Sequence, residues 1–380
     1  MKPPEYYKGK EQTYLKHFFL EQYLETVAAH IGYAQGEFVY VDCFSGPWRA
    51  EHEDLADTSI RIALDKLNYV REKVLAPHDR YPTIRAIFIE KDPIAFGALS
   101  EAVEQYHGSV KVTPLSGTFE DNIPAILAEV GGRFSFCFVD PTGWTGLSMD
   151  RIQPLLRHQP GEVVINFMYD FINRFLNSHD PATEASIDHF FGTDAWRKLR
   201  DSPERETDII KLYAEQVRST GKFPYVTSTR ILKPLHDRAY FHLIYATRNS
   251  KGIEKFRDVE KRLVTAQQQV REAAQREYRV DRTGQGELLF GASDTLSPSM
   301  EEERTRHRER ARIQLIELLM SGPQRYETLL PVLLQIPLFW KTDLHELIAD
   351  ERRVGRIVID GMGPRQRVPS DGCVIRLLPS

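Results

Sequence analysis

The sequence has few cysteines and no long hydrophobic run. Its three cysteines, Cys43, Cys137 and Cys373, are far apart and match neither a Cys-x-x-Cys pair nor the cysteine/histidine spacing of zinc sites. No stretch approaches the roughly 20 uninterrupted apolar residues of a membrane-spanning helix, and the N-terminus lacks the apolar core of a signal peptide. We therefore expect a soluble, cytoplasmic protein without disulfides and without a metal site.

The sequence also lacks an excess of charge of either sign. It has 50 lysines and arginines against 54 acidic residues, so its formal net charge is -4. This balance does not indicate a nucleic-acid or membrane partner, although a local basic patch can exist on a protein that is neutral overall. The 380 residues, 41% of them hydrophobic, suffice for one large domain with an appendage or for two domains.

Both common phosphate-binding glycine motifs are missing. The segment FVYVDCFSGPW, residues 38–48, predicts a buried strand followed by a tight turn. Its single glycine matches neither G-x-G-x-x-G nor G-x-x-x-x-G-K-[ST], which disfavours NAD and ATP. S-adenosylmethionine has no phosphate and needs a carboxylate beside a tight turn, so this segment suits that cofactor. The alternative is an ordinary turn after a buried strand.

Short apolar strands alternate with longer helical patterns over residues 1–250. This alternation predicts a Rossmann-like, doubly wound and mostly parallel sheet covered on both faces, closed by an antiparallel pair within 224–248. We expect a helix over 194–219, and a charged helix and a polar linker over 251–300. Three helices and a terminal hairpin over 301–380 predict a winged-helix-like module. The sequence thus predicts an α/β domain with a small α+β module.

Polar residues follow several of the expected strands, where parallel sheets bind ligands. Glu90 ends the strand TIRAIFIE and suits the two ribose hydroxyls of an adenosine, whereas Asp92 is better placed to cap the following helix. In the loop expected after the third strand, Phe119 and Thr118 are candidates for contacting the adenine. Asp121 either joins them or is the N-cap of the next helix.

The fourth strand ends in Asp140, Pro141 and, shortly afterwards, Trp144. This group suits an acceptor held against a methyl donor, and the alternative is a proline turn that ends the strand. The rim of the same site is expected to include Asn166, Asp170, Asn173 and Arg174. His17 is expected at the surface of the first helix or at an interface, rather than in a catalytic role.

Seven segments together resemble the three-Cys-motif partner protein family, over about the first 260 residues. They are YVDCFSGPW, DTSIRIAL, FIEKDP, FCFVDPTGWTG, GEVVINFMYDFINRF, FFGTDAWRKL and LIYATRNSKGIEKF. The resemblance implies a class I S-adenosylmethionine-dependent methyltransferase-like sheet and a partner with a three-cysteine motif, thought to be radical-SAM-like. Trp48 stands where the family commonly has glycine. Thr142 and Gly143 depart from the Asp-Pro-Pro-aromatic motif of amino-directed nucleic-acid methyltransferases.

These observations lead to two hypotheses of different classes. The first is a methyltransferase whose acceptor is a nucleic acid or another molecule. The second is a non-catalytic scaffold that binds DNA, RNA or a protein through the winged helix, where Arg352, Arg353, Arg356, Arg365 and Arg367 cluster. The expected cofactor contacts are Asp42, Phe44, Ser45, Gly46, Glu90, Thr118 and Phe119, and the expected catalytic residues are Asp140, Pro141 and Trp144.

Overall fold

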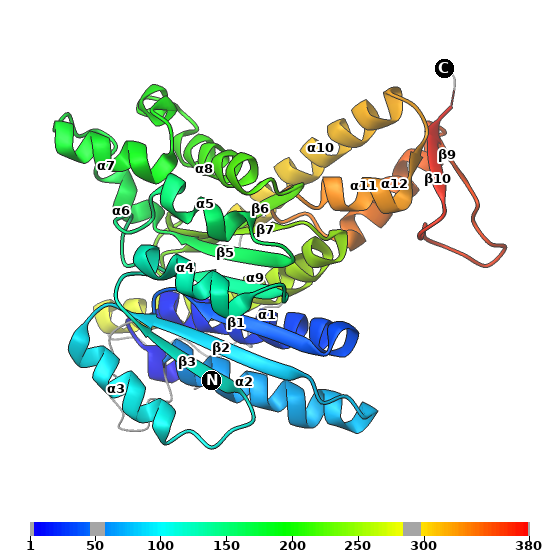
Figure 1. The fold of residues 1–380 in the computed structure, drawn as a ribbon. Helices are drawn as coiled ribbons and strands as arrows, with labels where there is room; N and C mark the ends of the chain where they lie inside the picture. The colour runs from blue at the N-terminus through cyan, green and yellow to red at the C-terminus, as the bar shows by residue number, and fades with distance from the viewer. Residues whose placement is uncertain (1–3, 46–57, 284–297, 379–380) are drawn as a thin grey trace. The chain divides into compact units, whose positions relative to one another are not determined.

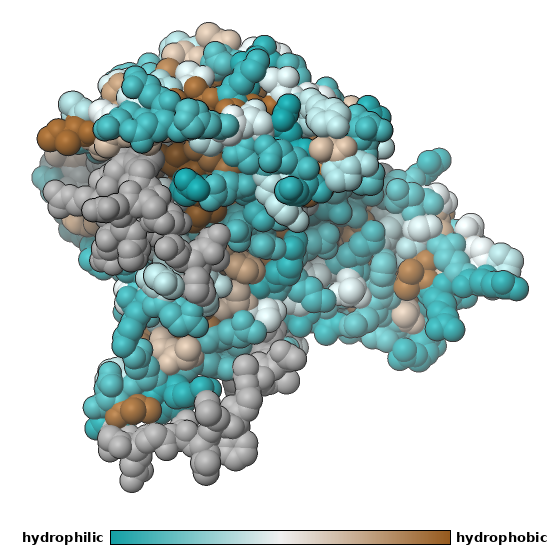
Figure 2. All heavy atoms as spheres, turned by 90° about the horizontal axis from the view of Figure 1, so that it is seen from below, coloured by the Kyte–Doolittle hydropathy of each residue, from teal (hydrophilic) through white to brown (hydrophobic). Residues whose placement is uncertain are grey.

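The computed structural model describes residues 4–45, 58–283 and 298–378. The chain divides into two compact units, Met1–Arg248 and Asn249–Ser380 (Figure 1). Hydrophilic residues cover most of the face in Figure 2, and hydrophobic residues appear there in small groups. Within the described ranges, no helix is both long and apolar enough to cross a membrane.

The first unit is built on a seven-stranded sheet with the order β3-β2-β1-β4-β5-β7-β6. Strands β1 to β5 are parallel, and β7 runs antiparallel to both β5 and β6. The strands are β1 Glu37–Asp42, β2 Thr83–Glu90, β3 Lys111–Ser116, β4 Ser135–Val139, β5 Gly161–Phe167, β6 Tyr225–Leu232 and β7 Ala239–Thr247. The expected Rossmann-like α/β sheet, with its antiparallel closing pair, is confirmed.

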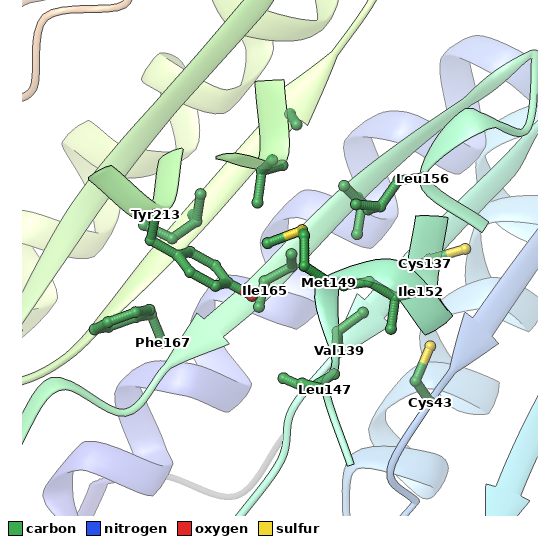
Figure 3. Close-up of a cluster of buried hydrophobic side chains, with 14 of the residues drawn as sticks. Cys43, Cys137, Val139, Leu147, Met149, Ile152, Leu156, Ile165, Phe167 and Tyr213 are labelled. Atoms are coloured by element: carbon green, nitrogen blue, oxygen red, sulfur yellow. The ribbon is translucent and has the colours of Figure 1, made fainter. Parts of the chain in front are cut away.

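Helices cover both faces of this sheet because its strands are apolar on both sides. On one face, Tyr23 of α1 packs its ring 5.2 Å from that of Phe136 on β4. On the other face, α5 and α8 bury Met149 and Tyr213 against β4 and β5 (Figure 3). The α-helices of this unit are α1 Glu11–Gln35, α2 Ser59–Tyr69, α3 Pro93–Glu104, α4 Phe119–Val130, α5 Met149–Arg157, α6 Tyr169–Asn173, α7 Pro181–Phe191 and α8 Arg205–Gly221.

The structure corrects one expected helix and the surface placement of His17. The helix predicted across residues 194–219 is interrupted, with a short 3₁₀ helix at Ala195–Leu199 before α8, because Pro203 disfavours helical backbone in the residue before it. His17 lies inside the fold rather than on its surface, with Nδ1 3.2 Å from the Tyr7 hydroxyl. Burial lowers the pKa of His17 to about 3.

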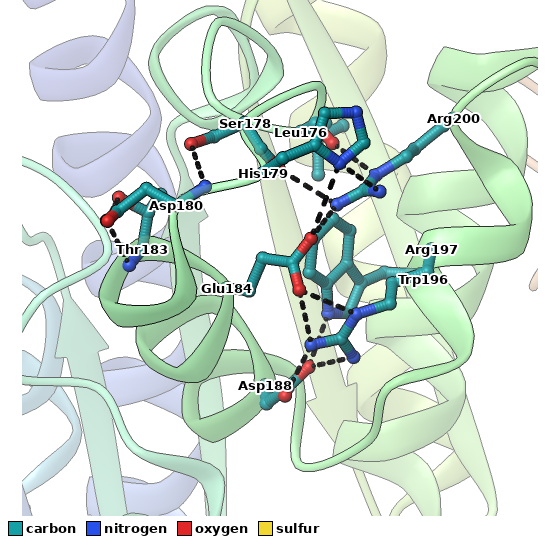
Figure 4. Close-up of polar contacts among 10 residues, drawn as sticks. All are labelled: Leu176, Ser178, His179, Asp180, Thr183, Glu184, Asp188, Trp196, Arg197 and Arg200. Carbon is teal, nitrogen blue, oxygen red and sulfur yellow. Dashed lines mark hydrogen bonds and ion pairs between the residues drawn. The ribbon is translucent and has the colours of Figure 1, made fainter.

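A network of ion pairs attaches the short 3₁₀ helix to α7 (Figure 4). Arg197 lies 2.6 Å from Asp188, and Arg200 lies 2.5 Å from Glu184. The fully buried Trp196 donates its indole N–H to the same Asp188. Because each charge in this network has an opposite partner, we assign it a structural role.

The described residues of the second unit form four α-helices and a small antiparallel sheet of order β8-β10-β9. Its elements are α9 Ser250–Thr283, α10 Pro298–Met320, β8 Gln324–Arg325, α11 Tyr326–Leu333, α12 Lys341–Arg353, β9 Ile357–Asp360 and β10 Val374–Leu377. Residues 284–297 of the expected linker lie outside the described residues. The winged-helix assignment stays a prediction.

Candidate functional site

Four neighbouring strands place a polar side chain at the same edge of the sheet. Strands β2, β1, β4 and β5 lie side by side, and Glu90, Asp42, Asp140 and Asn166 lie at or next to their carboxyl ends. The chain first extends the sheet from β1 to β3 and then returns to add β4 beside β1. Doubly wound sheets bind ligands at such a switch point. Asp42 and Asp140 flank it directly.

Asp42 is a buried carboxylate with three hydrogen-bond donors. It accepts hydrogen bonds from the Ser59 hydroxyl at 3.0 Å and from the Tyr40 hydroxyl and the Phe44 N–H at 3.3 Å each. Burial, followed by the negative charge of Asp140, raises the pKa of Asp42 to about 7. A cation bound beside this pair would favour the ionised carboxylate.

The turn after β1 is tied to the neighbouring strand. The Ser45 N–H donates to the carbonyl oxygen of Ile89 at 3.0 Å, and the Phe44 ring packs 5.3 Å from that of Phe119. Gly46, an expected cofactor contact, and Trp48 lie outside the described residues. The turn therefore presents Phe44 and Ser45 beside Asp42.

Glu90 and Asp92 have separate roles at the end of β2. Asp92 is the N-cap of α3, with Oδ1 accepting from the N–H groups of Ile94 and Ala95, as the sequence predicted. Glu90 is 5% exposed, and its Oε1 accepts from the Asp92 N–H at 2.7 Å. Within the described part of the chain, Oε2 of Glu90 has no hydrogen-bond partner, so one oxygen is available for a ligand.

The segment expected as a loop after β3 is instead the start of α4. Thr118 is the N-cap, and its hydroxyl accepts from the Asp121 N–H at 3.2 Å. Asp121 lies in the first helical turn and pairs with Arg151 at 2.6 Å, so its assignment as N-cap was wrong. Phe119 is 3% exposed and belongs to the hydrophobic core. The cofactor contacts of Thr118 and Phe119 stay predictions.

Asp140 is held by one residue of the neighbouring strand β5 and by one residue of helix α1. Its Oδ1 accepts from the Asn166 amide at 2.6 Å, and its Oδ2 lies 2.6 Å from Lys16 Nζ on α1. Asn166 Oδ1 is buried and has no hydrogen-bond partner among the described residues. The Asp140 carboxylate is thus held through both of its oxygens, and the Asn166 oxygen beside it is a buried, unsatisfied acceptor.

Pro141 and Trp144 follow Asp140 in different environments. Pro141 is buried, whereas Trp144 is half-buried and donates its indole N–H to the Ser186 hydroxyl at 3.0 Å. The Trp144 ring packs against Phe171 and Phe175, with centroids at 5.3 and 4.8 Å. The loop after β4 is therefore anchored to α7 and to the segment that contains α6.

The expected rim divides into two groups. Asn166 joins Asp140, while Asp170 is bonded to Arg174 at 2.7 Å and to Lys233 at 2.8 Å. Burial acts to raise the pKa of Asp170, but the hydrogen bonds from Lys233 and Arg174 outweigh it and lower the pKa. Asn173 accepts from the Tyr169 hydroxyl.

Sequence reasoning missed Lys16, Phe171 and Phe175. Lys16 is distant in sequence from Asp140, and the apolar spacing of the two phenylalanines does not show whether they are buried. A search of the described residues finds no cluster of three or more potential metal ligands. The three cysteines are buried, and none of them forms a disulfide bond.

No family model matches the chain, and no curated protein matches it. Among solved structures, the chain is similar to one described as loganic acid methyltransferase with SAH. The match has 10% sequence identity and a TM-score of 0.27, and it covers 70% of this chain and 89% of that chain.

Proposed function

We propose that the first unit binds S-adenosylmethionine and methylates an acceptor held beside Asp140. The observation that supports this most is the set of strand ends Glu90, Asp42, Asp140 and Asn166 across a topological switch point. S-adenosylmethionine presents a ribose diol, a sulfonium and an ammonium group. Carboxylates and an amide oxygen complement these groups chemically.

The residues at this edge fit the cofactor. Glu90 would bind the ribose hydroxyls through Oε2, and the turn of Phe44 and Ser45 would lie along the cofactor. Asp42 would face its cationic part, because a positive charge is favourable beside the Asp42 and Asp140 pair. When bound, the cofactor supplies an electrophilic methyl group.

On the acceptor side, the protein supplies mainly position. Asn166 and Lys16 orient Asp140, whose carboxylate would accept a hydrogen bond from the acceptor N–H or O–H and can take up its proton. Positioning can provide much of the acceleration of a methyl transfer.

Calorimetry with S-adenosylmethionine tests this proposal on wild type and Glu90→Ala. We expect binding by wild type and a loss of at least tenfold in affinity for Glu90→Ala, because one good charge-assisted contact is worth about 1.5–3 kcal/mol. Glu104→Ala, an exposed glutamate on α3, is the matched control and should bind normally. Absence of binding by the wild type would refute the proposal.

A three-cysteine-motif partner is part of the proposal, supported by the family resemblance alone. Co-expression of this chain with a three-cysteine-motif protein, followed by affinity purification, tests it. A stoichiometric complex that survives gel filtration is the expected result. Separate elution of the two proteins at micromolar concentration would remove the partner from the proposal.

The second candidate function is a scaffold that binds DNA or RNA through the C-terminal unit. The loop between β9 and β10 favours it, because Arg365 and Arg367 are exposed and no acidic residue occurs between Gly361 and Ser370. Neither arginine has an ion-pair partner in the described part of the chain. Gln366 lies between the two arginines in sequence and anchors the loop, because its side-chain amide donates to the Val368 carbonyl oxygen and to the Ser370 hydroxyl.

The other arginines of this region are less available. Arg353 pairs with Asp350 at 3.0 Å, and Arg356 pairs with the buried Glu351 at 3.2 Å. We propose that the unit is a winged-helix-like module whose loop contacts phosphates. The double variant Arg365→Ala/Arg367→Ala should weaken binding of a fluorescent 20-nucleotide duplex or single strand.

Titration of this nucleic-acid binding against salt distinguishes a unit that binds DNA or RNA from one that binds a protein. Loss of both arginines should flatten the slope of log affinity against log salt by about two, because each phosphate contact contributes roughly 0.7–0.9. Arg353→Ala, which removes a paired arginine, should leave the slope nearly unchanged. Wild-type binding that is absent or insensitive to salt would instead favour a protein partner.

A further inference from the structure

Three aromatic rings gather next to the candidate catalytic loop. Trp144 lies 5.3 Å from Phe171 and 4.8 Å from Phe175, and the two phenylalanine rings are 5.6 Å apart. Phe171 and Phe175 are each 37% exposed, although they are large hydrophobic side chains. We call Trp144, Phe171 and Phe175 the aromatic platform. Exposed aromatic clusters on soluble proteins commonly mark binding surfaces.

Contacts with neighbouring residues hold the aromatic platform in a fixed position. The Trp144 indole N–H is bonded to Ser186 of α7. Gly143 leaves room for the Phe171 ring, since a Cβ atom at position 143 would lie 3.1 Å from Phe171 Cε1. Rigid aromatic side chains lose little conformational entropy when a ligand binds.

An exposed arginine belongs to the same segment as the two phenylalanines of the platform. Arg174, between Phe171 and Phe175 in sequence, is 65% exposed in its side chain and pairs with Asp170. The same Asp170 also pairs with Lys233. Arg174 and Lys233 therefore share the Asp170 carboxylate, and the exposed Arg174 guanidinium belongs to the same segment as the two exposed rings.

The connectivity places the platform near Asp140. Trp144 follows Asp140 in the same loop, and Asn166, which is bonded to Asp140, directly precedes the α6 segment that contains Phe171. A ligand ring on the platform would therefore lie beside the carboxyl ends of β4 and β5, on the acceptor side of the proposed site.

We propose that the aromatic platform is the acceptor-docking site and that it takes a nucleotide, with the base stacked on the rings and the phosphate at Arg174. This inference rests on the proposed methyltransferase function, whose acceptor class it names. Bases stack on aromatic side chains whatever their sequence, and a nearby guanidinium binds the backbone. A purely apolar acceptor would gain nothing from the charge at Arg174.

The test is photocrosslinking of the full chain to a mixed-sequence single-stranded oligonucleotide that contains 5-iodouracil. We expect a crosslink in the peptide with Phe171 and Phe175, and a loss of strand affinity of about 5- to 150-fold in Phe171→Ala/Phe175→Ala. Arg174→Ala should flatten the salt dependence by about one contact. Tyr81→Ala, an equally large change at a 64% exposed aromatic residue before β2, should keep the crosslink.

The outcomes separate this inference from the function on which it rests. Cofactor binding that persists in Phe171→Ala/Phe175→Ala while the crosslink disappears supports the docking site. Cofactor binding without a platform crosslink, or with crosslinks only around Arg365 and Arg367, overturns the inference and leaves the methyltransferase proposal standing. A platform crosslink in a protein that binds no S-adenosylmethionine supports the nucleotide site and refutes the methyltransferase. Competition for the crosslink by nucleoside monophosphates distinguishes a site for a free nucleotide from a site for a nucleic-acid strand.

Discussion

Lys16 and Asp140 form an ion pair of 2.6 Å between the first helix and the loop after β4. The side chain of Lys16 is 21% exposed and that of Asp140 is 13% exposed, so solvent screens the pair only partly. The Asn166 amide holds the other oxygen of Asp140. Helix α1 thus covers the sheet and also fixes the Asp140 carboxylate at the carboxyl end of β4.

Lys16→Met should destabilise the first unit by about 1–3 kcal/mol, because it leaves the mostly buried Asp140 carboxylate without its cation. Urea denaturation followed by circular dichroism measures the change. Lys111→Met replaces an exposed lysine at the start of β3 and should cost little. Equal stability of the Lys16 and Lys111 variants would show that the ion pair contributes nothing.

Asp42→Asn should make the first unit less sensitive to pH. The pKa of Asp42 is raised from its ordinary value of 3.8 to about 7, so the folded state binds a proton more tightly than the unfolded state. The free energy of unfolding of the wild type therefore falls as pH rises from about 4 to about 7, by up to roughly 4 kcal/mol, and levels off above that range.

Denaturation of Asp42→Asn and wild type between pH 5 and 9 measures this difference. The asparagine oxygen can replace Oδ1, which accepts from the Phe44 N–H, and the Ser59 hydroxyl, which faces Oδ2, can accept from the asparagine amide, so the fold should persist. The variant should gain stability relative to wild type as pH rises toward 7. A difference that stays constant with pH would mean that Asp42 titrates normally.

Binding of S-adenosylmethionine should release protons near pH 7. The cationic part of the cofactor beside Asp42 would favour its ionised form and so displace the proton that burial retains there. Calorimetric titrations in two buffers with different ionisation enthalpies measure the number of protons released. Asp42→Asn should abolish the buffer dependence, and a wild type with none would remove Asp42 from the cofactor contacts.

The strand ends could be predicted from sequence because each is a polar residue directly after a buried apolar run. Glu90 and Asp140 were found in this way. The start of α4 was misplaced although Thr118 and Asp121 have the spacing of a capping box, a local signal that was readable. Lys16 could not be found, because its contact with Asp140 depends on where α1 packs on the sheet.

Tyr23→Phe should destabilise the first unit by about 1–3 kcal/mol, and by more at pH 8 than at pH 5. The Tyr23 hydroxyl lies 2.6 Å from Glu162 Oε2, and the Thr247 hydroxyl donates to the other oxygen. Burial raises the pKa of Glu162 despite these bonds. Loss of one donor raises that pKa further, so the cost grows once pH exceeds the raised pKa that Glu162 has in the folded wild type.

Tyr213→Phe is the matched control for Tyr23→Phe. The Tyr213 hydroxyl is also buried, but no hydrogen-bond partner for it exists among the described residues. Removal of an unsatisfied buried hydroxyl should be neutral or stabilising. Urea denaturation at both pH values compares the two variants, and equal losses for both would contradict the role of the Glu162 network.

In the second unit, Arg257→Met should cost about 3–5 kcal/mol, because it leaves the buried Glu260 without its cation. Arg257 lies 2.5 Å from Glu260 Oε1 and donates to the Leu334 carbonyl oxygen, while the Trp340 indole N–H donates to Glu260 Oε2. The double variant Arg257→Met/Glu260→Gln should recover part of the loss, since no buried charge then remains unpaired. Hydrogen exchange of α9 and α11, measured by mass spectrometry, locates the loss of stability. A double variant less stable than Arg257→Met would show that Glu260 does not depend on Arg257.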